Sequence, residues 1–285
     1  MKKSVLVALL FAVVLHPVLL LAQGTDRFIL LASTIGPVDA EIVSLLEDSF
    51  EKESGIRVRH VGAGTGEALK MAEQGNFDLV LVHAKSLEEK FVKNKFGTER
   101  IPLMYNDFVI VGPSSDPAGI RGTTSATAAL AKIAAQGAPF VSRGDKSGTH
   151  VAETELWAKT GLKPGGPWYR IYEKGNEGNA PTLRYCDQVG AYTVIDRATY
   201  LSLKDRIKLV VLVEKDPALL NFISLIPVNP EKFHQVNTED TATFIKWLVS
   251  PTKGQQIIRD FGIEKYGAPL FFPDSREWHF LHDKK

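Results

Sequence analysis

A short turn between a predicted strand and a predicted helix carries residue types that bind anions. Residues 140–150 read FVSRGDKSGTH. The guanidinium of Arg143 is a planar fork of donors that suits an oxyanion. Gly148 lets the backbone approach a ligand, and the hydroxyls of Ser147 and Thr149 can cap the helix or donate to a ligand. Because the first amides of a helix have no intrahelical partner, this turn predicts an anion site at a helix N-terminus.

Two other interpretations of the turn stay open at this point. It can be a capped helix whose Arg143–Asp145 pair is simply solvated, or it can belong to a serine hydrolase. Ser49 and Lys52 have a Ser-x-x-Lys spacing, but neither a Ser-Asp-Asn element nor a Gly-x-Ser-x-Gly elbow accompanies them. A P-loop is excluded because GAGTGEA lacks the Lys-Ser/Thr pair that must follow its glycines. We therefore expect a binding protein and no enzyme.

The elements around the turn are short strands that alternate with helices. Each of three strand patterns is followed by a helical pattern. These strands lie at 27–33, 56–62 and 77–84, and the last of them is expected to be buried. The alternation predicts an α/β architecture with mainly parallel sheets flanked by helices. In such sheets ligands lie beyond the carboxyl ends of the strands. Three loops are expected there, at 33–36, 62–66 and 83–85.

Two stretches of the chain are candidates for crossings between lobes. A strand pattern at 107–112 runs into the Pro/Gly/Ser-rich stretch GPSSDPAGI, and the strand FISLIPVN leads back. The crossings predict a first lobe of residues 25–110 and 223–285 and a second lobe of residues 111–222. A ligand-binding cleft is then expected between the lobes.

The N-terminus has the pattern of a secretory signal peptide. Lys2 and Lys3 precede an apolar run over 5–22, and small residues follow it. We predict a cleavable signal over residues 1–24 and a mature protein exported to the periplasm. An uncleaved membrane anchor is the alternative, but the run is barely long enough to span a bilayer and contains Pro17.

Charge and cysteine content limit the possible partners. Removal of Lys2 and Lys3 takes the formal charge from +1 to −1, so no overall basicity indicates nucleic-acid binding. The single cysteine, Cys186, lies far from the leader, so we expect neither a lipid-bearing cysteine nor an intramolecular disulfide. The seven histidines show no metal-ligand spacing, and we expect no bound metal and no cofactor.

Several longer stretches resemble the periplasmic tungstate-binding proteins of the TupA type, the solute receptors of tungstate ABC importers. The resemblance covers residues 27–273 and is strongest in PLMYNDFVIVGPSSDPAGI, GAPFVSRGDKSGTH, GAYTVIDRATYLSLKDRIKLVVLVE and GAPLFFP. It implies the two-lobed type II periplasmic binding-protein fold and capture of tungstate or molybdate between the lobes. It also implies an ABC permease in the inner membrane as partner, and we expect a monomer. Carried onto matching positions, the family's donors are Thr65, Ser142, Arg143, Ser147, Gly148 and Thr149.

The first strand departs from the family pattern at its end. The family has a run of threonines and a serine there, whereas this chain reads ASTIGPVD. Ser33 and Thr34 match hydroxyl positions, but Ile35 and its neighbours do not. Thr182 lies in an element similar to the family's ATLR and can be either a ligand contact or a helix cap.

Phosphate or sulfate receptors are the alternative, because phosphate receptors share a similar turn. Tungstate and molybdate are unprotonated dianions that need only donors, whereas hydrogen phosphate also needs an acceptor. Phosphate receptors place a carboxylate after a first-lobe strand, where this chain has His83. This difference favours tungstate or molybdate, and His83 is interpreted as structural rather than as a ligand contact.

Overall fold

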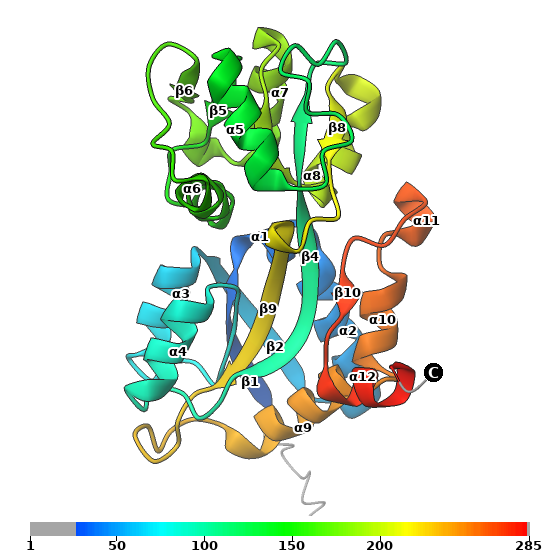
Figure 1. The fold of residues 1–285 in the computed structure, drawn as a ribbon. Coiled ribbons are helices and arrows are strands. Elements are labelled where there is room, and N and C mark those ends of the chain that lie inside the picture. The colour runs from blue at the N-terminus through cyan, green and yellow to red at the C-terminus, as the bar shows by residue number, and fades with distance from the viewer. Residues whose placement is uncertain (1–26, 284–285) are drawn as a thin grey trace, which may run out of the picture.

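The computed structural model describes residues 27–283, which form two lobes with a cleft between them (Figure 1). The first lobe is built on a sheet whose strand order is β10-β4-β9-β3-β1-β2. The strands are β1 (Phe28–Thr34), β2 (Arg57–Ala63), β3 (Leu79–Val82), β4 (Ile101–Gly112), β9 (Leu220–Pro227) and β10 (Phe272–Pro273). The predicted strands at 27–33, 56–62 and 77–84 therefore exist and lie side by side.

The first-lobe sheet is mixed rather than mainly parallel. Strands β1, β2 and β3 are parallel to one another, but β9 is antiparallel to β3 and β4, and β10 is antiparallel to β4. The reason is the two crossings: β4 leaves the first lobe and β9 returns to it, so these neighbours must run in opposite directions. The expectation of a mainly parallel sheet is wrong at this half of the sheet.

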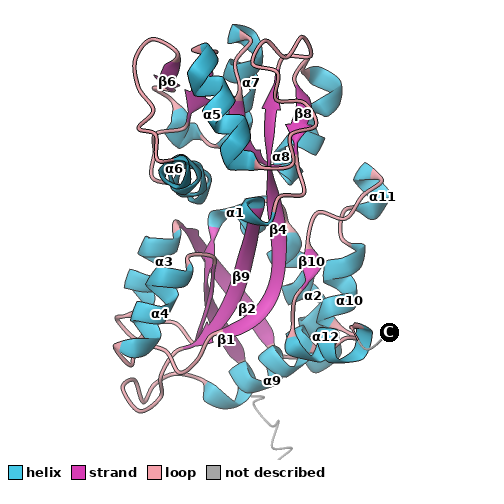
Figure 2. Cartoon of the chain, in the orientation of Figure 1, coloured by secondary structure: helices cyan, strands magenta, loops and turns pink. Residues whose placement is uncertain are grey.

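Helices cover both faces of this sheet (Figure 2). Leu79 and Leu81 of β3 pack into one core cluster with Phe50 and Phe244, whereas Val80 and Val82 pack into another. This alternation is the period-2 geometry of a strand buried on both faces. The first-lobe helices are α1 (Ile35–Asp39), α2 (Ile42–Ser54), α3 (Thr65–Ala72), α4 (Lys85–Lys93), α9 (Thr238–Val249), α10 (Gly254–Asp260), α11 (Ile263–Tyr266) and α12 (Arg276–His282).

The second lobe carries the anion-type turn. Strands β7 (Thr193–Asp196) and β8 (Val210–Val213) pair antiparallel with the end of β4, and β5 (Phe140–Ser142) pairs parallel with β6 (Tyr169–Ile171). Its helices are α5 (Ala126–Gln136), α6 (Gly148–Thr160), α7 (Asn179–Val189) and α8 (Arg197–Leu203), with short 3₁₀ turns η1 (Gly175–Glu177), η2 (Lys204–Arg206) and η3 (Pro217–Leu219). The antiparallel pairs again differ from the mainly parallel sheet that we expected.

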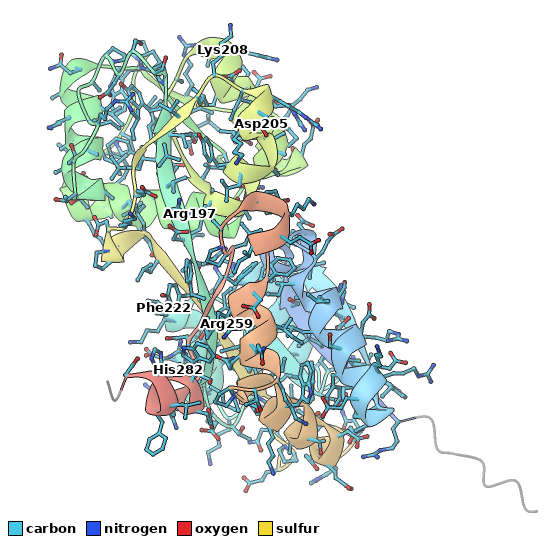
Figure 3. All side chains as sticks on the ribbon, turned by 90° about the vertical axis from the view of Figure 1, so that its right-hand side faces the viewer. Arg197, Asp205, Lys208, Phe222, Arg259 and His282 are labelled. Atoms are coloured by element: carbon cyan, nitrogen blue, oxygen red, sulfur yellow. The ribbon has the colours of Figure 1, made fainter. Side chains whose placement is uncertain are left out.

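The two lobes meet where β4 changes partners. Residues up to Asp107 pair with β9, and residues from Phe108 pair with β7. Arg197 of α8 donates to both carboxylate oxygens of Asp107 and also to Glu214. This ion-pair cluster ties the second lobe to the crossing strand, and Arg197 lies at the junction of the lobes in Figure 3. The division at residues 110/111 and 222/223 stays a prediction.

None of the helices within residues 27–283 is both long and apolar enough to cross a membrane. The predicted signal peptide, residues 1–24, lies outside the described residues.

Candidate functional site

A cavity of about 1380 Å³ lies in the cleft between the lobes. Both lobes contribute to its walls, and helices from each begin there. Thr65 starts α3 in the first lobe, while Gly148 starts α6 and Asn179 starts α7 in the second lobe; all three residues line the cavity. The positive ends of three helix dipoles are therefore directed at one space, which favours an anion.

Arg143 is held in the cleft by two side chains. Its Nη1 donates to Asn179 Oδ1 and its Nη2 donates to Asp145 Oδ2, and its side chain is only 11% exposed. Its third donor, Nε, is buried without a hydrogen-bond partner. The guanidinium is thus fixed on one side and keeps a free donor on the other.

The carboxylate of Asp145 is bonded within the turn and is not left without partners in the cavity. It accepts from Arg143 and from both the amide and the hydroxyl of Ser147, at 3.1 Å and 2.7 Å. Burial opposes its charge, but the bonds from Ser147 and the charge of Arg143 outweigh burial and lower the pKa of Asp145. Asp145 therefore helps to orient Arg143.

The head of α6 keeps two amides for a ligand. Ser147 Oγ accepts from the amide of His150, and Asp145 accepts from the amide of Ser147. Among the hydrogen bonds of residues 27–283, none uses the amides of Gly148 and Thr149. Both residues line the cavity, as predicted from the turn.

The first-lobe wall supplies two threonine hydroxyls. Thr34 ends β1 and Thr65 begins α3, so both follow the carboxyl ends of neighbouring parallel strands. Both line the cavity, and the Oγ1 atom of each is buried without a partner. Leaving a buried hydroxyl without a hydrogen-bond partner costs about 1–3 kcal/mol of free energy. A ligand oxygen that accepts from both hydroxyls would remove this cost.

Unpartnered buried donors are concentrated at this site. Among the described residues, six buried side-chain oxygen or nitrogen atoms have no hydrogen-bond partner, and Thr34 Oγ1, Thr65 Oγ1 and Arg143 Nε are three of them. These three come from both lobes and line the same cavity. A single acceptor-rich ligand would satisfy all of them.

Four of the predicted ligand contacts have hydroxyls bonded to other partners in the structure. One is Ser147, which lines the cavity and donates to Asp145, and the other three do not line it. The hydroxyl of Ser33 donates to Thr34 O, that of Ser142 to Glu153 Oε2, and that of Thr182 to Gly178 O. All three residues are completely buried, and they lie behind the cavity wall instead of lining it. The reason is the local geometry: alternation turns Ser33 away from Thr34 along β1, and Ser142 ends β5 beneath α6. Thr182 lies within the first turn of α7 and bonds back to the residue before the helix.

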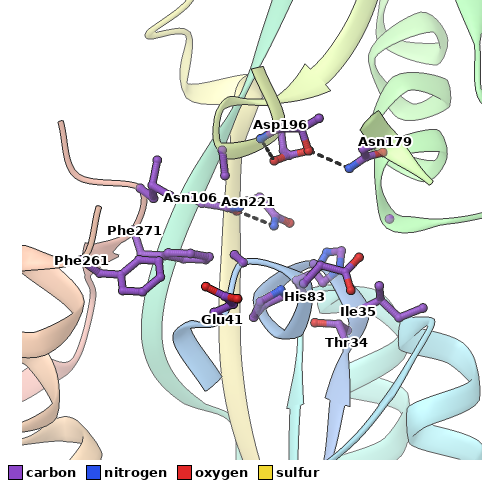
Figure 4. Close-up of a pocket in the computed structure, with 18 of the residues that line it drawn as sticks. Thr34, Ile35, Glu41, His83, Asn106, Asn179, Asp196, Asn221, Phe261 and Phe271 are labelled. Carbon is purple, nitrogen blue, oxygen red and sulfur yellow. Dashed lines mark hydrogen bonds between the residues drawn. The ribbon is translucent and has the colours of Figure 1, made fainter. Parts of the chain in front are cut away.

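Two residues that the sequence analysis missed position Arg143. Asn179 donates from Nδ2 to Asp196 Oδ2 at 2.6 Å while its Oδ1 accepts from Arg143. Asp196, which Figure 4 shows bonded to Asn179, also accepts from the amide and hydroxyl of Thr199 in the first turn of α8. The sequence offered one signal, an Asn directly after Gly178 at a helix start, but its partner lies 36 residues away in the chain.

His83 lies at the floor of the cleft. It follows β3 and lines the cavity, close to Asn221 of β9. Asn221 donates to Asn106 of β4 at 2.7 Å, which links the two crossing strands beside His83 (Figure 4). Burial, the largest effect, lowers the pKa of His83 and keeps the imidazole neutral.

Asp39 of α1 is a carboxylate that faces the second lobe. Burial, followed by the nearby charge of Asp196, raises its pKa, and Arg143 acts in the opposite direction. Asp39 also lines the cavity. Among the acidic groups of residues 27–283 with a shifted pKa, it is the one in this cavity whose pKa depends on the charges of both Asp196 and Arg143.

Comparisons with known proteins agree with this geometry. Residues 22–252 match the PBP superfamily domain. The tungstate-binding protein TupA of Peptoclostridium acidaminophilum is 42% identical over 249 residues, which cover 87% of this chain and 86% of the relative. TupA of Campylobacter jejuni is 35% identical over 239 residues, covering 82% and 87% of the two chains.

Solved structures show the same relationship. The structure of the tungstate-binding protein TupA from Desulfovibrio alaskensis G20 superposes with a TM-score of 0.80 at 40% identity, covering 88% of this chain and all of the other. A tungstate ABC transporter structure from Geobacter sulfurreducens has a TM-score of 0.72 at 40% identity, covering 83% and 99%. The predicted periplasmic binding-protein fold is confirmed. The chain belongs to the PBP superfamily and, within it, to the family of the TupA proteins.

Proposed function

We propose that this protein is the tungstate receptor of an ABC importer and that it captures the dianion between its lobes. The observation that carries the proposal is the convergence of Thr34 Oγ1, Thr65 Oγ1 and Arg143 Nε, three buried donors without partners, on one cavity. The TupA relatives, at 42% and 35% identity, support tungstate as the ligand.

The binding mechanism is replacement of water by fixed donors. The amides of Gly148 and Thr149, the two threonine hydroxyls and the Arg143 guanidinium surround the oxyanion when the lobes close. Because the protein has already ordered these groups, little reorganisation opposes binding. Each bond that satisfies a buried donor recovers the cost of leaving that donor unpaired, about 1–3 kcal/mol.

Selectivity for an unprotonated dianion follows from the state of the carboxylates around Arg143. Asp145 is engaged by Arg143 and Ser147, and Asp196 is engaged by Asn179 and Thr199. Neither carboxylate has to face the ligand as a free acceptor. Such a wall suits tungstate and molybdate, whereas a ligand that carries a proton would need an acceptor other than Asp145 and Asp196.

The remaining parts of the proposal concern the cell. The leader exports the protein to the periplasm, where it acts as a monomer. Tungstate binding draws the lobes together around the crossing strands β4 and β9, and the closed form docks on a membrane permease. No step of this cycle requires a resident metal, a cofactor or a catalytic serine. The two serines of the turn support this, since Ser142 bonds to Glu153 and Ser147 to Asp145.

A phosphate or sulfate receptor is the second candidate, and one observation favours phosphate. Asp39 lines the cavity near Arg143, and its raised pKa makes it a carboxyl group that can share a proton with hydrogen phosphate. The proposal for tungstate therefore predicts that Asp39→Asn leaves tungstate affinity within about threefold of the original.

Calorimetric titration with tungstate, molybdate, sulfate and phosphate tests the function. We expect tungstate and molybdate to bind at least tenfold more tightly than sulfate and phosphate, with one ion per protein. Tightest binding of phosphate, together with its loss in Asp39→Asn, would instead establish the second candidate.

A further inference from the structure

The two lobes touch at one defined point beside the anion-type turn. Gly148 is the first residue of α6, and a Cβ placed on it would lie 2.2 Å from Cε1 and 2.8 Å from Nε2 of His83. The imidazole of the first lobe is therefore packed directly against the backbone at the head of α6. A side chain of any size at position 148 cannot share this space with His83.

His83 lies where the two strands that connect the lobes are joined. Asn221 of β9, which is close to the imidazole, donates to Asn106 of β4 at 2.7 Å. Burial also holds the ring in its neutral form, so it adds no charge next to the oxyanion site. The approach of α6 toward the first lobe consequently ends on an uncharged ring that lies against Gly148.

We propose that His83 is the spacer that sets how far the cleft closes, and thereby the size of oxyanion that the site selects. The inference rests on the proposed function for its choice of ligands. Gly148 supplies a ligand amide in that function, so the distance between His83 and α6 fixes the distance between the donors of the second lobe and the hydroxyls of Thr34 and Thr65. Without the imidazole, the lobes would close further around a smaller tetrahedral ion such as sulfate.

Gly148→Ala and His83→Ala form a pair that tests this contact. The backbone at Gly148 does not have a positive φ, so alanine is compatible with α6 when the lobes are apart. In the arrangement that the structure shows, however, the added Cβ would collide with His83, so the lobes of the variant must stand further apart. We expect Gly148→Ala to weaken tungstate binding at least tenfold while thermal unfolding of the free protein stays unchanged. The double variant should recover most of this loss, because the methyl group then occupies the space of the imidazole.

Gly36→Ala is the matched control. Gly36 also lines the cavity, yet a Cβ placed on it meets nothing within 4 Å, and we expect tungstate affinity close to that of the original protein. The single variant His83→Ala should lower the ratio of tungstate to sulfate affinity at least threefold. An unrescued double variant, or an unchanged ratio in His83→Ala, overturns the inference.

The same titrations separate this inference from the proposed function. If the original protein binds sulfate or phosphate and not tungstate, the proposed function fails, and the rescue of Gly148→Ala by His83→Ala is then measured with the ion that binds. A protein that binds none of the four ions overturns both.

Discussion

Arg143 has donors on three nitrogen atoms, and the protein engages only two of those atoms. Nη1 and Nη2 bond to Asn179 and Asp145, while Nε stays buried and unpartnered. This division explains why an arginine stands here and not a lysine: a single ammonium group cannot be anchored by two side chains and still present a fixed donor in a third direction.

Arg143→Ala should weaken tungstate binding at least tenfold, which is about 1.4 kcal/mol, because it removes both a cation and the free donor. Calorimetry measures the loss, and circular dichroism verifies the fold. Arg59→Ala is the control, since Arg59 is an exposed arginine whose partner Glu51 lies outside the cleft. Unchanged affinity in Arg143→Ala would refute the role assigned to this residue.

Asn179→Ala should weaken binding about three- to tenfold, less than Arg143→Ala. The change leaves the guanidinium anchored by Asp145 alone, so its orientation becomes less certain. Because Asn179 acts through Arg143, the double variant Arg143→Ala/Asn179→Ala should bind no more weakly than Arg143→Ala. Additive losses in this cycle would show that Asn179 acts independently of Arg143.

At this scale the sequence predicted the donors of the turn but not their neighbours. Arg143, Ser147, Gly148 and Thr149 line the cavity because a Gly-rich turn before a helix has few local geometries. The positions of Ser33, Ser142 and Thr182 behind the wall could not be predicted, since a hydroxyl's direction depends on tertiary packing. The contact of His83 with Gly148 joins residues from different lobes, and no local pattern encodes it.

Among the elements, helix α6 carries the site, and a buried acid fixes it to the rest of its lobe. Glu153 accepts from Ser142 Oγ at 2.6 Å, from Tyr169 Oη at 2.8 Å and from Trp157 Nε1 at 3.2 Å. Ser142 ends the strand that precedes the turn, so this carboxyl group joins both ends of the anion-binding segment. Burial raises the pKa of Glu153 to about 7 despite these three bonds.

Glu153→Gln should make the free energy of unfolding less dependent on pH. Between pH 4.5, the ordinary value for a glutamate, and about 7, the folded protein binds more protons at this site than the unfolded chain does. Glu153 therefore makes stability fall as pH rises through this window, by up to about 3 kcal/mol. The amide keeps the size and most of the bonds but cannot be charged.

Urea unfolding at pH 5 and pH 8 measures this effect. We expect Glu153→Gln and the original protein to have similar stability at pH 5, and the variant to be more stable by about 1–3 kcal/mol at pH 8. A variant that is less stable at pH 8 than at pH 5, relative to the original, would contradict the assignment.

The elements themselves were largely predictable, but their directions were not. The period-2 and period-3.6 patterns located β1, β2, β3 and the helices that follow them, because burial imposes those periods on the sequence. An apolar run such as that of β9 predicts a buried strand but does not predict whether the strand is parallel or antiparallel to its neighbours. The antiparallel pairing of β9 with β3 and β4 follows from the return crossing, which is a property of the topology.

At the scale of the whole molecule, two strands connect the two lobes and allow them to close. One contact between the lobes limits how far they close. Strands β4 and β9 cross between the lobes, and Arg197 binds Asp107 where β4 changes partners. His83 and Gly148 meet within the cleft. The two-lobed architecture could be predicted because strand–helix alternation is interrupted twice, whereas the angle between the lobes depends on contacts between distant residues.

Crystals grown with tungstate, measured at a wavelength where tungsten scatters anomalously, show directly where the protein holds the ion. We expect one strong tungsten peak in the cleft. The oxygens of the tungstate ion should lie within hydrogen-bond distance of Arg143 Nε, Thr34 Oγ1 and Thr65 Oγ1. A tungsten position elsewhere on the protein, with these three donors still unpartnered, would contradict this expectation.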